Sequence, residues 1–551
     1  MKRVVLAAAL AMAAIVAQAP QALAQTACPS APTPITVTGS IASNTTWSSS
    51  NIYLLSGFVY VESGATLTIQ PGTIIKGDKT SKGTLIVRQG GKLNAAGTAS
   101  APIVFTSNQP AGTRDRGDWG GIILCGRAPQ NIPATATQPL PQIEGGPNAF
   151  FGGTDPADNS GVLQFIRIEF AGVALTPNNE INGLTFGAVG NGTVVDHIQV
   201  SYSGDDSYEW FGGTVNCKYL VTFRGLDDEW DTDNGFSGKV QFGVALRDPD
   251  IADVSGSNGF ESDNDANGTT NQPQTQAVFA NMSNFIAPPT AGNTLASDYK
   301  RGMHIRRNSA ESVFNSLSIG YPVGLLLDGT LAEQNATGGL LKLRGNVFAG
   351  YAPNKKATVV SGSTFNAKQF LGANNDTTAT VGSLNLSPSN FSLTSPNFVP
   401  LSTSPLSTGA VTDAKLNDPF FTAVNYRGAF APGGTSWTAS WTNFDPQTTC
   451  YNRAGQTLAT KSATDKSLEM GVYPNPATGA AKLSFALRTA TTATVRVLDA
   501  TGRLVATVAA NQKLAAGPQL LALPASLAPG LYMATVTTPE TTESVRFVVA
   551  E

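Results

Sequence analysis

Short apolar triplets recur through the middle of the chain, and their spacing constrains the fold more than any other feature of the sequence. Two series are evenly spaced with a period of 23: Ile198, Val221 and Val244, and Val200, Phe223 and Leu246. A period of this size is typical of stacked repeats. Coils with two or three strands each suit a parallel β-helix, in which successive coils hydrogen-bond at about 4.8 Å. We therefore predict that these six side chains stack in rows inside a β-helix, whereas an antiparallel sandwich or propeller would have other periods.

The composition excludes several classes of function. Charged residues make up 13% of the chain and the net charge is −3, without the basic patch that nucleic-acid binding through phosphate neutralisation requires. The 56 glycines and 33 prolines indicate many turns and short strands. His197 and His304 are the only histidines, so a multi-histidine metal site is excluded.

The N-terminus has the pattern of a secretory signal peptide over residues 1–24. Lys2 and Arg3 precede an apolar run over residues 4–17, and small residues at 22 and 24 predict cleavage near Ala24. The run is too short for a transmembrane helix, and no later segment is long and apolar enough to span a bilayer. The sequence therefore predicts an exported chain without a transmembrane segment after cleavage.

Four cysteines in an exported chain permit three disulfide pairings, and the sequence leaves the choice open. A bond between Cys28 and Cys450 would join the two ends of the large central region. Cys125 and Cys217 each lie in an apolar, strand-like run, where a buried free thiol is the more common outcome.

Glycine- and aspartate-rich motifs make the fold prediction more specific. These motifs are Gly117-Asp118-Trp119-Gly120-Gly121, Asp155-Pro156-Ala157-Asp158-Asn159, Asp205-Asp206-Ser207-Tyr208-Glu209-Trp210 and Asp231-Thr232-Asp233-Asn234-Gly235. They resemble the repeats of a family of secreted right-handed β-helix proteins from the Bacteroidota, over roughly residues 35–450. The resemblance implies an all-β, right-handed solenoid outside the cell, and it implies no reaction. We expect an N-terminal cap and β-helix over residues 25–351 and irregular terminal coils with a cap over residues 352–451.

A polar linker, residues 452–467, precedes a distinct unit over residues 468–551. Alternating strands separated by tight turns predict a small antiparallel, Ig-like β-sandwich. The order of its motifs, from Val472-Tyr473-Pro474-Asn475-Pro476 to Val545-Arg546-Phe547-Val548-Val549, resembles the type A C-terminal sorting domain of the type IX secretion system. The resemblance implies the secretion machinery and its sorting peptidase as partners, and a passenger that is released or attached to surface lipopolysaccharide. An ordinary Ig-like accessory module is the alternative.

Acidic residues are concentrated in two consecutive coils of a chain that has few charges. An offset of 22 places Asp205 on Asp227 and Asp206 on Asp228, and an offset of 23 also places acid over acid. Two carboxylates about 4.8 Å apart repel by roughly 3 kcal/mol at an effective dielectric near 20, and calcium would offset this cost with oxygen ligands. The sequence Asp263-Asn264-Asp265 begins a calcium-loop pattern whose twelfth position, Gln274, lacks the bidentate glutamate. The predicted calcium ligands are Asp205, Asp206, Asp227, Asp228, Asp231, Asp233, Asp263 and Asp265, with solvated turns as the alternative.

Three aromatic residues, Tyr208, Trp210 and Trp230, lie beside these acids. Exposed, they would form a substrate-binding surface on which sugar rings stack; the alternative is that they pack at coil corners. We therefore expect a secreted or surface-attached protein for adhesion or glycan binding without catalysis. The alternative is a polysaccharide lyase with Arg224 or Arg247 as base, or a glycoside hydrolase with two of the carboxylates, and both rest on analogy of fold.

Overall fold

The structure is a computed structural model. It describes residue 28, residues 30–176, 179–289, 294–456 and 458, and residues 468–550 apart from 469, 474, 478, 480, 488–489, 501, 516 and 540–541. The predicted signal peptide and most of the predicted linker lie outside the described residues. Within these ranges no helix is long and apolar enough to cross a membrane.

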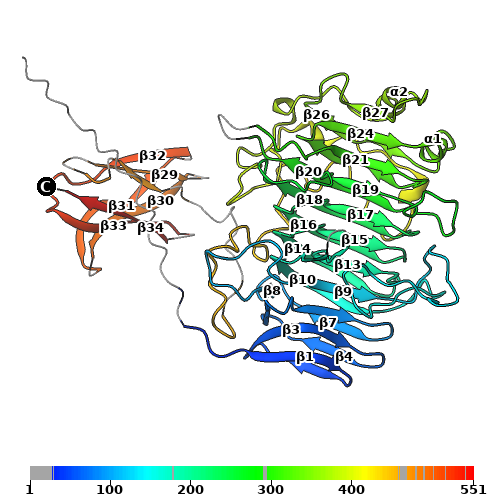
Figure 1. The fold of residues 1–551 in the computed structure, drawn as a ribbon. Helices are drawn as coiled ribbons and strands as arrows, with labels where there is room; N and C mark the ends of the chain where they lie inside the picture. Colours follow the sequence, from blue (N-terminus) through cyan, green and yellow to red (C-terminus); the bar gives the residue numbers. More distant parts are fainter. Residues whose placement is uncertain are drawn as a thin grey trace, which may run out of the picture.

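Parallel strands stack along a solenoid, as Figure 1 shows. Their pairings place them in three columns. Five long strands each contribute to two columns: β10 (Gly161–Glu169), β14 (Val194–Ser201), β16 (Asn216–Phe223), β18 (Lys239–Arg247) and β20 (Val278–Ile286). Column 1 comprises their first halves together with β2 (Thr45–Trp47), β4 (Thr66–Ile69), β7 (Lys92–Ala96), β22 (Ser312–Phe314) and β25 (Leu343–Arg344). Column 2 comprises the second halves of the five long strands with β5 (Ile74–Gly77), β8 (Ile103–Ser107), β23 (Leu317–Ile319) and β26 (Val347–Ala349). These pairings are parallel throughout, so the parallel β-helix prediction is confirmed.

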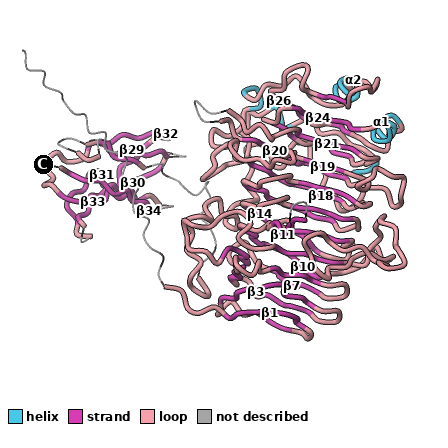
Figure 2. Tube along the Cα trace, viewed as in Figure 1, coloured by secondary structure: helices cyan, strands magenta, loops and turns pink. Residues whose placement is uncertain are grey.

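Column 3 forms the remaining side of the solenoid and bears the acidic residues. It comprises β6 (Thr84–Val87), β9 (Gly121–Cys125), β13 (Leu184–Gly187), β15 (Tyr208–Phe211), β17 (Trp230–Asp233), β19 (Phe260–Ser262), β21 (Arg301–Arg306), β24 (Val323–Asp328) and β27 (Ala357–Val359). β1 (Ile35–Ile41) and β3 (Ile52–Val61) lie in the first two coils and pair in parallel; β3 in turn pairs with β5 of column 2 and β6 of column 3. A hairpin of β11 (Ala174–Thr176) and β12 (Asn179–Glu180) interrupts the coils, and two short helices, α1 (Thr330–Thr337) and α2 (Ala367–Gly372), lie near the last ones (Figure 2).

A ladder of left-handed residues bends each long strand from column 1 into column 2. Phe165, His197, Tyr219 and Phe242 have φ between 49° and 64° and occupy equivalent places in successive coils. Their rings stack, with centroids 4.4 Å apart from Phe165 to His197 and again from His197 to Tyr219. Stacking compensates the strain of this backbone conformation. His197 is therefore part of the scaffold.

The strand register corrects the predicted interior rows. β14 and β16 pair at an offset of 22 residues, so Ile198 lies beside Leu220 and not beside Val221. β16 and β18 pair at an offset of 23 residues, so Val221 lies beside Val244 as predicted. Side chains alternate between the two faces of a strand, so a slip of one residue reverses the face. Ile198 and Val200 are in the interior cluster. The other four predicted residues belong to a second cluster on the outer face: Val221, Phe223, Val244 and Leu246.

An irregular segment, here called the strap (residues 382–456), covers that outer face. The strap contains the short 3-10 turns Gly382–Leu384, Pro405–Ser407 and Ala414–Leu416. Phe398, Phe430 and Trp441 of the strap pack against the outer residues of column 2. Val411, Leu416 and Phe421 of the strap pack against those of column 1. The strap therefore buries a sheet face that would otherwise be an exposed apolar surface.

Three side-chain amides of the solenoid bind the strap backbone in the same manner. Asn315 pairs with the N–H and C=O of Val411, at 2.8 and 3.0 Å. Gln241 pairs likewise with Thr422, and Gln199 with Asn443, at 2.8 Å for each bond. The solenoid residue numbers fall as the strap numbers rise. The strap therefore runs back from the last coils toward the first ones.

A disulfide fixes the end of the strap. Cys28 and Cys450 are bonded, with Cα atoms 5.6 Å apart and a sequence separation of 422. Tyr451 packs beside the first coils with Ile52 and Ile74. Cys125 and Cys217 are buried free thiols. The bond therefore joins the two ends of the solenoid region because the strap has returned to its beginning.

The C-terminal unit consists of two antiparallel sheets with their own core. One sheet contains β28 (Gly471–Tyr473), β29 (Lys482–Leu487) and β32 (Gly517–Ala522); the other contains β30 (Thr491–Asp499), β31 (Leu504–Leu514), β33 (Gly530–Thr537) and β34 (Thr542–Val549). Val495, Val497, Ala534 and Phe547 lie in this core. The predicted small antiparallel β-sandwich is confirmed.

Candidate metal centre

The acidic residues of column 3 form a row along the outer face of the solenoid. Glu209, Asp231, Glu261 and His304 occupy one register position on β15, β17, β19 and β21. Alternation explains the row, because the residues on either side of each one point into the core. Successive strands of a sheet lie about 4.8 Å apart, so the fold holds like charges together.

Just before these strands, a second set of acids stacks in the turns. The backbone N–H of Asp228 donates to Oδ1 of Asp206 at 2.8 Å, and Tyr208 pairs with Trp230. Of the two offsets that the sequence leaves open, the structure thus has the smaller one, with Asp206 beneath Asp228.

Three overlapping groups bring carboxylate oxygens within 4.8 Å of one another. The groups are Asp205, Asp206 and Asp227; Asp206, Glu209 and Asp231; and Asp228, Asp231 and Glu261. Groups of three carboxylates at this distance could hold a metal ion, with up to three oxygen ligands from side chains. Asp206 and Asp231 each belong to two of the groups, so the three potential positions share ligands.

Burial and mutual repulsion dominate the electrostatics of these groups. Burial, then the charges of Glu261 and Asp263, raise the pKa of Asp231 well above its usual value. Burial raises the pKa of Asp227 to about 6. Asp231 Oδ1 and Asp227 Oδ1 are both buried without a hydrogen-bond partner among the described residues. Buried unpaired oxygens are costly, and a cation would satisfy them.

Two of the predicted ligands have other roles. Asp263 accepts hydrogen bonds from Arg306 Nε at 2.8 Å and from Arg307 at 3.0 Å. Asp265 accepts from the backbone N–H groups of Asn267 and Thr269 and so holds its own loop together. In this structure, arginines and backbone amides thus use the oxygens of both aspartates. Asp233 is on β17, where burial and the charge of Asp263 raise its pKa to about 7.

The predicted sugar-stacking residues are in the core. Tyr208, Trp210 and Trp230 have no exposed surface. They stack inside the solenoid, with 5.4 Å between the ring centroids of Tyr208 and Trp230, so they offer no surface to a sugar. The expectation of a surface role is wrong because these residues alternate with the acids along β15 and β17, and the acids point outward.

Glu261 belongs to the site although the sequence pattern did not identify it as a ligand. It pairs with Asp231 across the coil between β17 and β19, which is longer than the two coils before it. Burial would raise the pKa of Glu261, but the hydrogen bond from His304 and the charge of Arg306 outweigh it and lower the pKa. His304 Nδ1 lies 3.2 Å from Glu261, and Nε2 lies 3.1 Å from Asp328. No constant period would have found Glu261.

Both arginines considered as a catalytic base form ion pairs with carboxylates. Arg247 is fully buried and forms an ion pair with Glu229 at 2.9 Å. Burial would lower the pKa of Arg247, but the charge of Glu229, with Tyr299 and Tyr321, outweighs it and raises the pKa. A base must give up its proton, and this environment retains the proton. Arg224 pairs with Asp248 and lines a separate cavity.

The architecture defines a class of protein: a parallel β-helix with a covering strap, followed by a small antiparallel β-sandwich. Residues 39–388 match the family described as pectate-lyase like β-helix domain, and this match covers more than half of the chain. The chain belongs to that family. Residues 471–550 match the secretion system C-terminal sorting domain, which indicates export to the cell surface or medium by the type IX machinery. The comparisons found no match among curated proteins and none among solved structures.

Proposed function

We propose that this secreted β-helix protein binds calcium at the acidic groups of column 3 and uses that face for adhesion or glycan binding without catalysis. The observation that carries the proposal is Asp231, which two acidic groups share and whose Oδ1 is buried without a partner in the described part of the chain. Extracellular calcium prefers six to eight oxygen ligands. Carboxylates from stacked coils supply several, and water or glycan hydroxyls supply the others.

The environment of the arginines supports binding over a lyase reaction. Arg306 is the arginine closest in register to the acids, and it pairs with Glu261 and with Asp263. Burial would lower the pKa of Arg306, but these carboxylates raise it. An arginine held protonated between two carboxylates stabilises the face and does not abstract a proton.

The proposal includes the route of export. The signal peptide would be removed near Ala24, and the sorting peptidase would then remove the C-terminal domain at the outer membrane. The passenger would be released or attached to lipopolysaccharide. The sorting-domain match supports this route.

A second candidate is a glycoside hydrolase, favoured by one pair of carboxyl groups. The pKa of Asp231 is raised and that of Glu261 is lowered, although the two share one acidic group. A proton donor beside an ionised carboxylate is the arrangement of glycosidases, whose retaining members have carboxyls about 5 Å apart. Oxygens of Asp231 and Glu261 lie within 4.8 Å of each other, which is nearer to the retaining than to the inverting separation of about 6.5–9.5 Å.

Calcium titration of the mature chain tests the proposal. Isothermal titration should show binding by the wild type that is lost when Asp228→Asn and Asp231→Asn are combined. Asp250→Asn is the matched control, because Asp250 is exposed and outside the three groups. Absence of calcium binding by the wild type would contradict the proposal.

A polysaccharide panel separates binding from catalysis. We expect glycan retention that decreases in chelator and in the combined Asp228→Asn and Asp231→Asn variant, with no release of reducing ends or unsaturated products. Release of reducing ends by the wild type, abolished by Glu261→Gln in a folded protein, would establish the hydrolase instead.

A further inference from the structure

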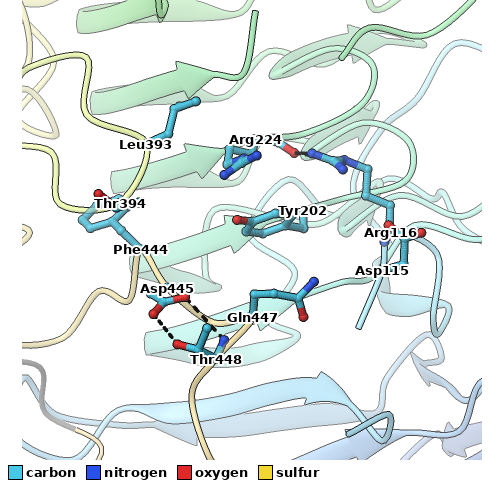
Figure 3. Close-up of a pocket in the computed structure, with 10 residues that line it drawn as sticks. All are labelled: Asp115, Arg116, Tyr202, Arg224, Leu393, Thr394, Phe444, Asp445, Gln447 and Thr448. Carbon is cyan, nitrogen blue, oxygen red and sulfur yellow. Dashed lines mark hydrogen bonds between the residues drawn. The ribbon is translucent and has the colours of Figure 1, made fainter. Parts of the chain in front are cut away.

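A cavity of about 350 Å³ lies between the strap and the solenoid (Figure 3). The solenoid side is formed by Asp115, Arg116, Tyr202 and Arg224; the strap side by Leu393, Thr394, Phe444, Asp445, Gln447 and Thr448. Its volume is within the range of small-molecule sites, roughly 300–1,000 Å³. None of these residues belongs to the three acidic groups, so the cavity is distinct from the proposed calcium site.

The solenoid wall is rigid and polar. Arg116 and Arg224 both lie over the ring of Tyr202, at 5.2 and 5.1 Å from its centroid, and Phe170 stacks on Tyr202 at 5.1 Å. Arg116 donates to the backbone carbonyl of Arg224 at 2.7 Å, and Arg224 also pairs with Asp248. These contacts hold both guanidinium groups in place before any ligand arrives, which reduces the entropy cost of binding.

Two residues of the cavity have unused hydrogen-bonding capacity. Arg224 Nε, a donor, and Gln447 Oε1, an acceptor, are buried without hydrogen-bond partners within the described ranges. The other end of the Gln447 amide is held by the carbonyl of Arg114 at 2.6 Å. Native proteins rarely leave buried polar atoms unsatisfied. Two residues that line one cavity thus carry an unpaired donor and an unpaired acceptor.

The charges around the cavity indicate which ligand it fits. Arg116 and Arg224 face three carboxylates, those of Asp115, Asp445 and the paired Asp248. The surroundings are therefore not positive overall, which disfavours an anion. Leu393 and Phe444 add apolar wall. Mixed donors and acceptors with an apolar wall match a neutral sugar ring, which has vicinal hydroxyls on its edges and C–H groups on its faces.

We infer that this cavity is a second carbohydrate site, which binds one neutral sugar residue independently of calcium. Asp445 and Gln447 accept hydrogen bonds from sugar hydroxyls, and Arg224 donates to a sugar oxygen. Phe444 and Leu393 cover a C–H face of the ring. The sugar enters between strap and solenoid, where Thr394 is exposed.

Saturation-transfer NMR of the full mature chain with methyl glycosides of glucose, galactose and mannose tests this inference. We expect signals on the ring protons of at least one glycoside that persist in EDTA and in the combined Asp228→Asn and Asp231→Asn variant. This insensitivity to calcium distinguishes the cavity from the acidic face, so either site can fail without the other.

Two variants assign the signal to the cavity. Thr394→Trp fills the space from an exposed position, and Thr403→Trp, also exposed on the strap but outside the cavity, is its control. Asp445→Asn removes the charge that accepts from Thr448, and Asp376→Asn is its control because Asp376 caps a similar turn.

We expect at least a tenfold loss of affinity in both cavity variants and no change in the controls. Absence of binding by the wild type, binding that survives Thr394→Trp, or tighter binding of glucuronate than of the neutral glycosides would overturn the inference.

Discussion

Replacing Asp231 by Asn should stabilise the protein without calcium and weaken its stabilisation by calcium. Asp231 belongs to two groups whose oxygens lie within 4.8 Å. One pair of carboxylates at that distance repels by about 3 kcal/mol at an effective dielectric of 20. Asparagine keeps the size of the side chain and removes its charge. We therefore expect the free energy of unfolding in chelator at pH 8 to rise by up to about 3 kcal/mol.

Calcium should reverse the order of the two proteins. A ligand at a hundredfold excess over its Kd stabilises the native state by about 2.7 kcal/mol, and the wild type should gain this amount. The variant has lost a ligand common to two positions and should gain much less. The same substitution thus has opposite effects in chelator and in saturating calcium.

Thermal unfolding followed by circular dichroism, in EDTA and in millimolar calcium, measures both effects. In EDTA the variant should melt several degrees above the wild type, and Asp250→Asn, an exposed site outside the groups, should melt with the wild type. If Asp231→Asn lowers or does not change the melting temperature in EDTA, the carboxylates do not repel in the native state and the reasoning is refuted.

Four further expectations concern pH, the strap, the disulfide and export. Burial raises the pKa of Asp227 to about 6 and that of Asp233 to about 7 in the folded state, above the ordinary 3.8. Because the folded state then binds these protons more tightly than the unfolded state, the free energy of unfolding without calcium should fall as the pH rises from about 4 to 8. A rise in denaturant titrations would contradict this. Gln199→Leu leaves a strap N–H and C=O unpaired and should cost about 2–3 kcal/mol in the same titrations, unlike substitutions at exposed strap positions. Cys28→Ser removes a disulfide that spans a sequence separation of 422, so the free energy of unfolding should fall by up to about 5 kcal/mol and protease should cut the strap. A strap that resists protease in this variant would show that its packing alone holds it. A chain without its C-terminal sorting domain should accumulate in the periplasm, and undiminished levels in the medium would defeat this expectation.

The type of fold could be predicted from the sequence because its signals are local. Alternating apolar residues define strands, their period defines stacked coils, and turn motifs separate them. The stacking of acid over acid was also predictable, because both candidate offsets, 22 and 23, bring Asp205 and Asp206 against the next pair. The sorting domain was recognisable for the same reason, since its motifs follow one another in the chain.

The direction of side chains was decided by the tertiary structure. Val221 and Phe223 are as apolar as Ile198, yet they lie outside the solenoid, because the strap buries the outer face of columns 1 and 2 as completely as the coils bury the inner one. When both faces of a strand are buried, apolar alternation no longer identifies the interior. Trp210 and Trp230 show the converse on β15 and β17 of column 3, where the indole rings lie in the core and the acids point to the outer face.

Contacts between distant segments also required the structure. Glu261 joins Asp231 across a coil of unusual length, and Cys28 meets Cys450 because the strap runs the length of the solenoid backward. Arg224 and Gln447 meet across the cavity for the same reason. By itself, the sequence determined the repeating unit, its export and its acidic stack, since these depend on neighbours within about one coil. The tertiary structure decided which faces are covered and which residues share a site, because loop lengths and the return of the strap set those distances.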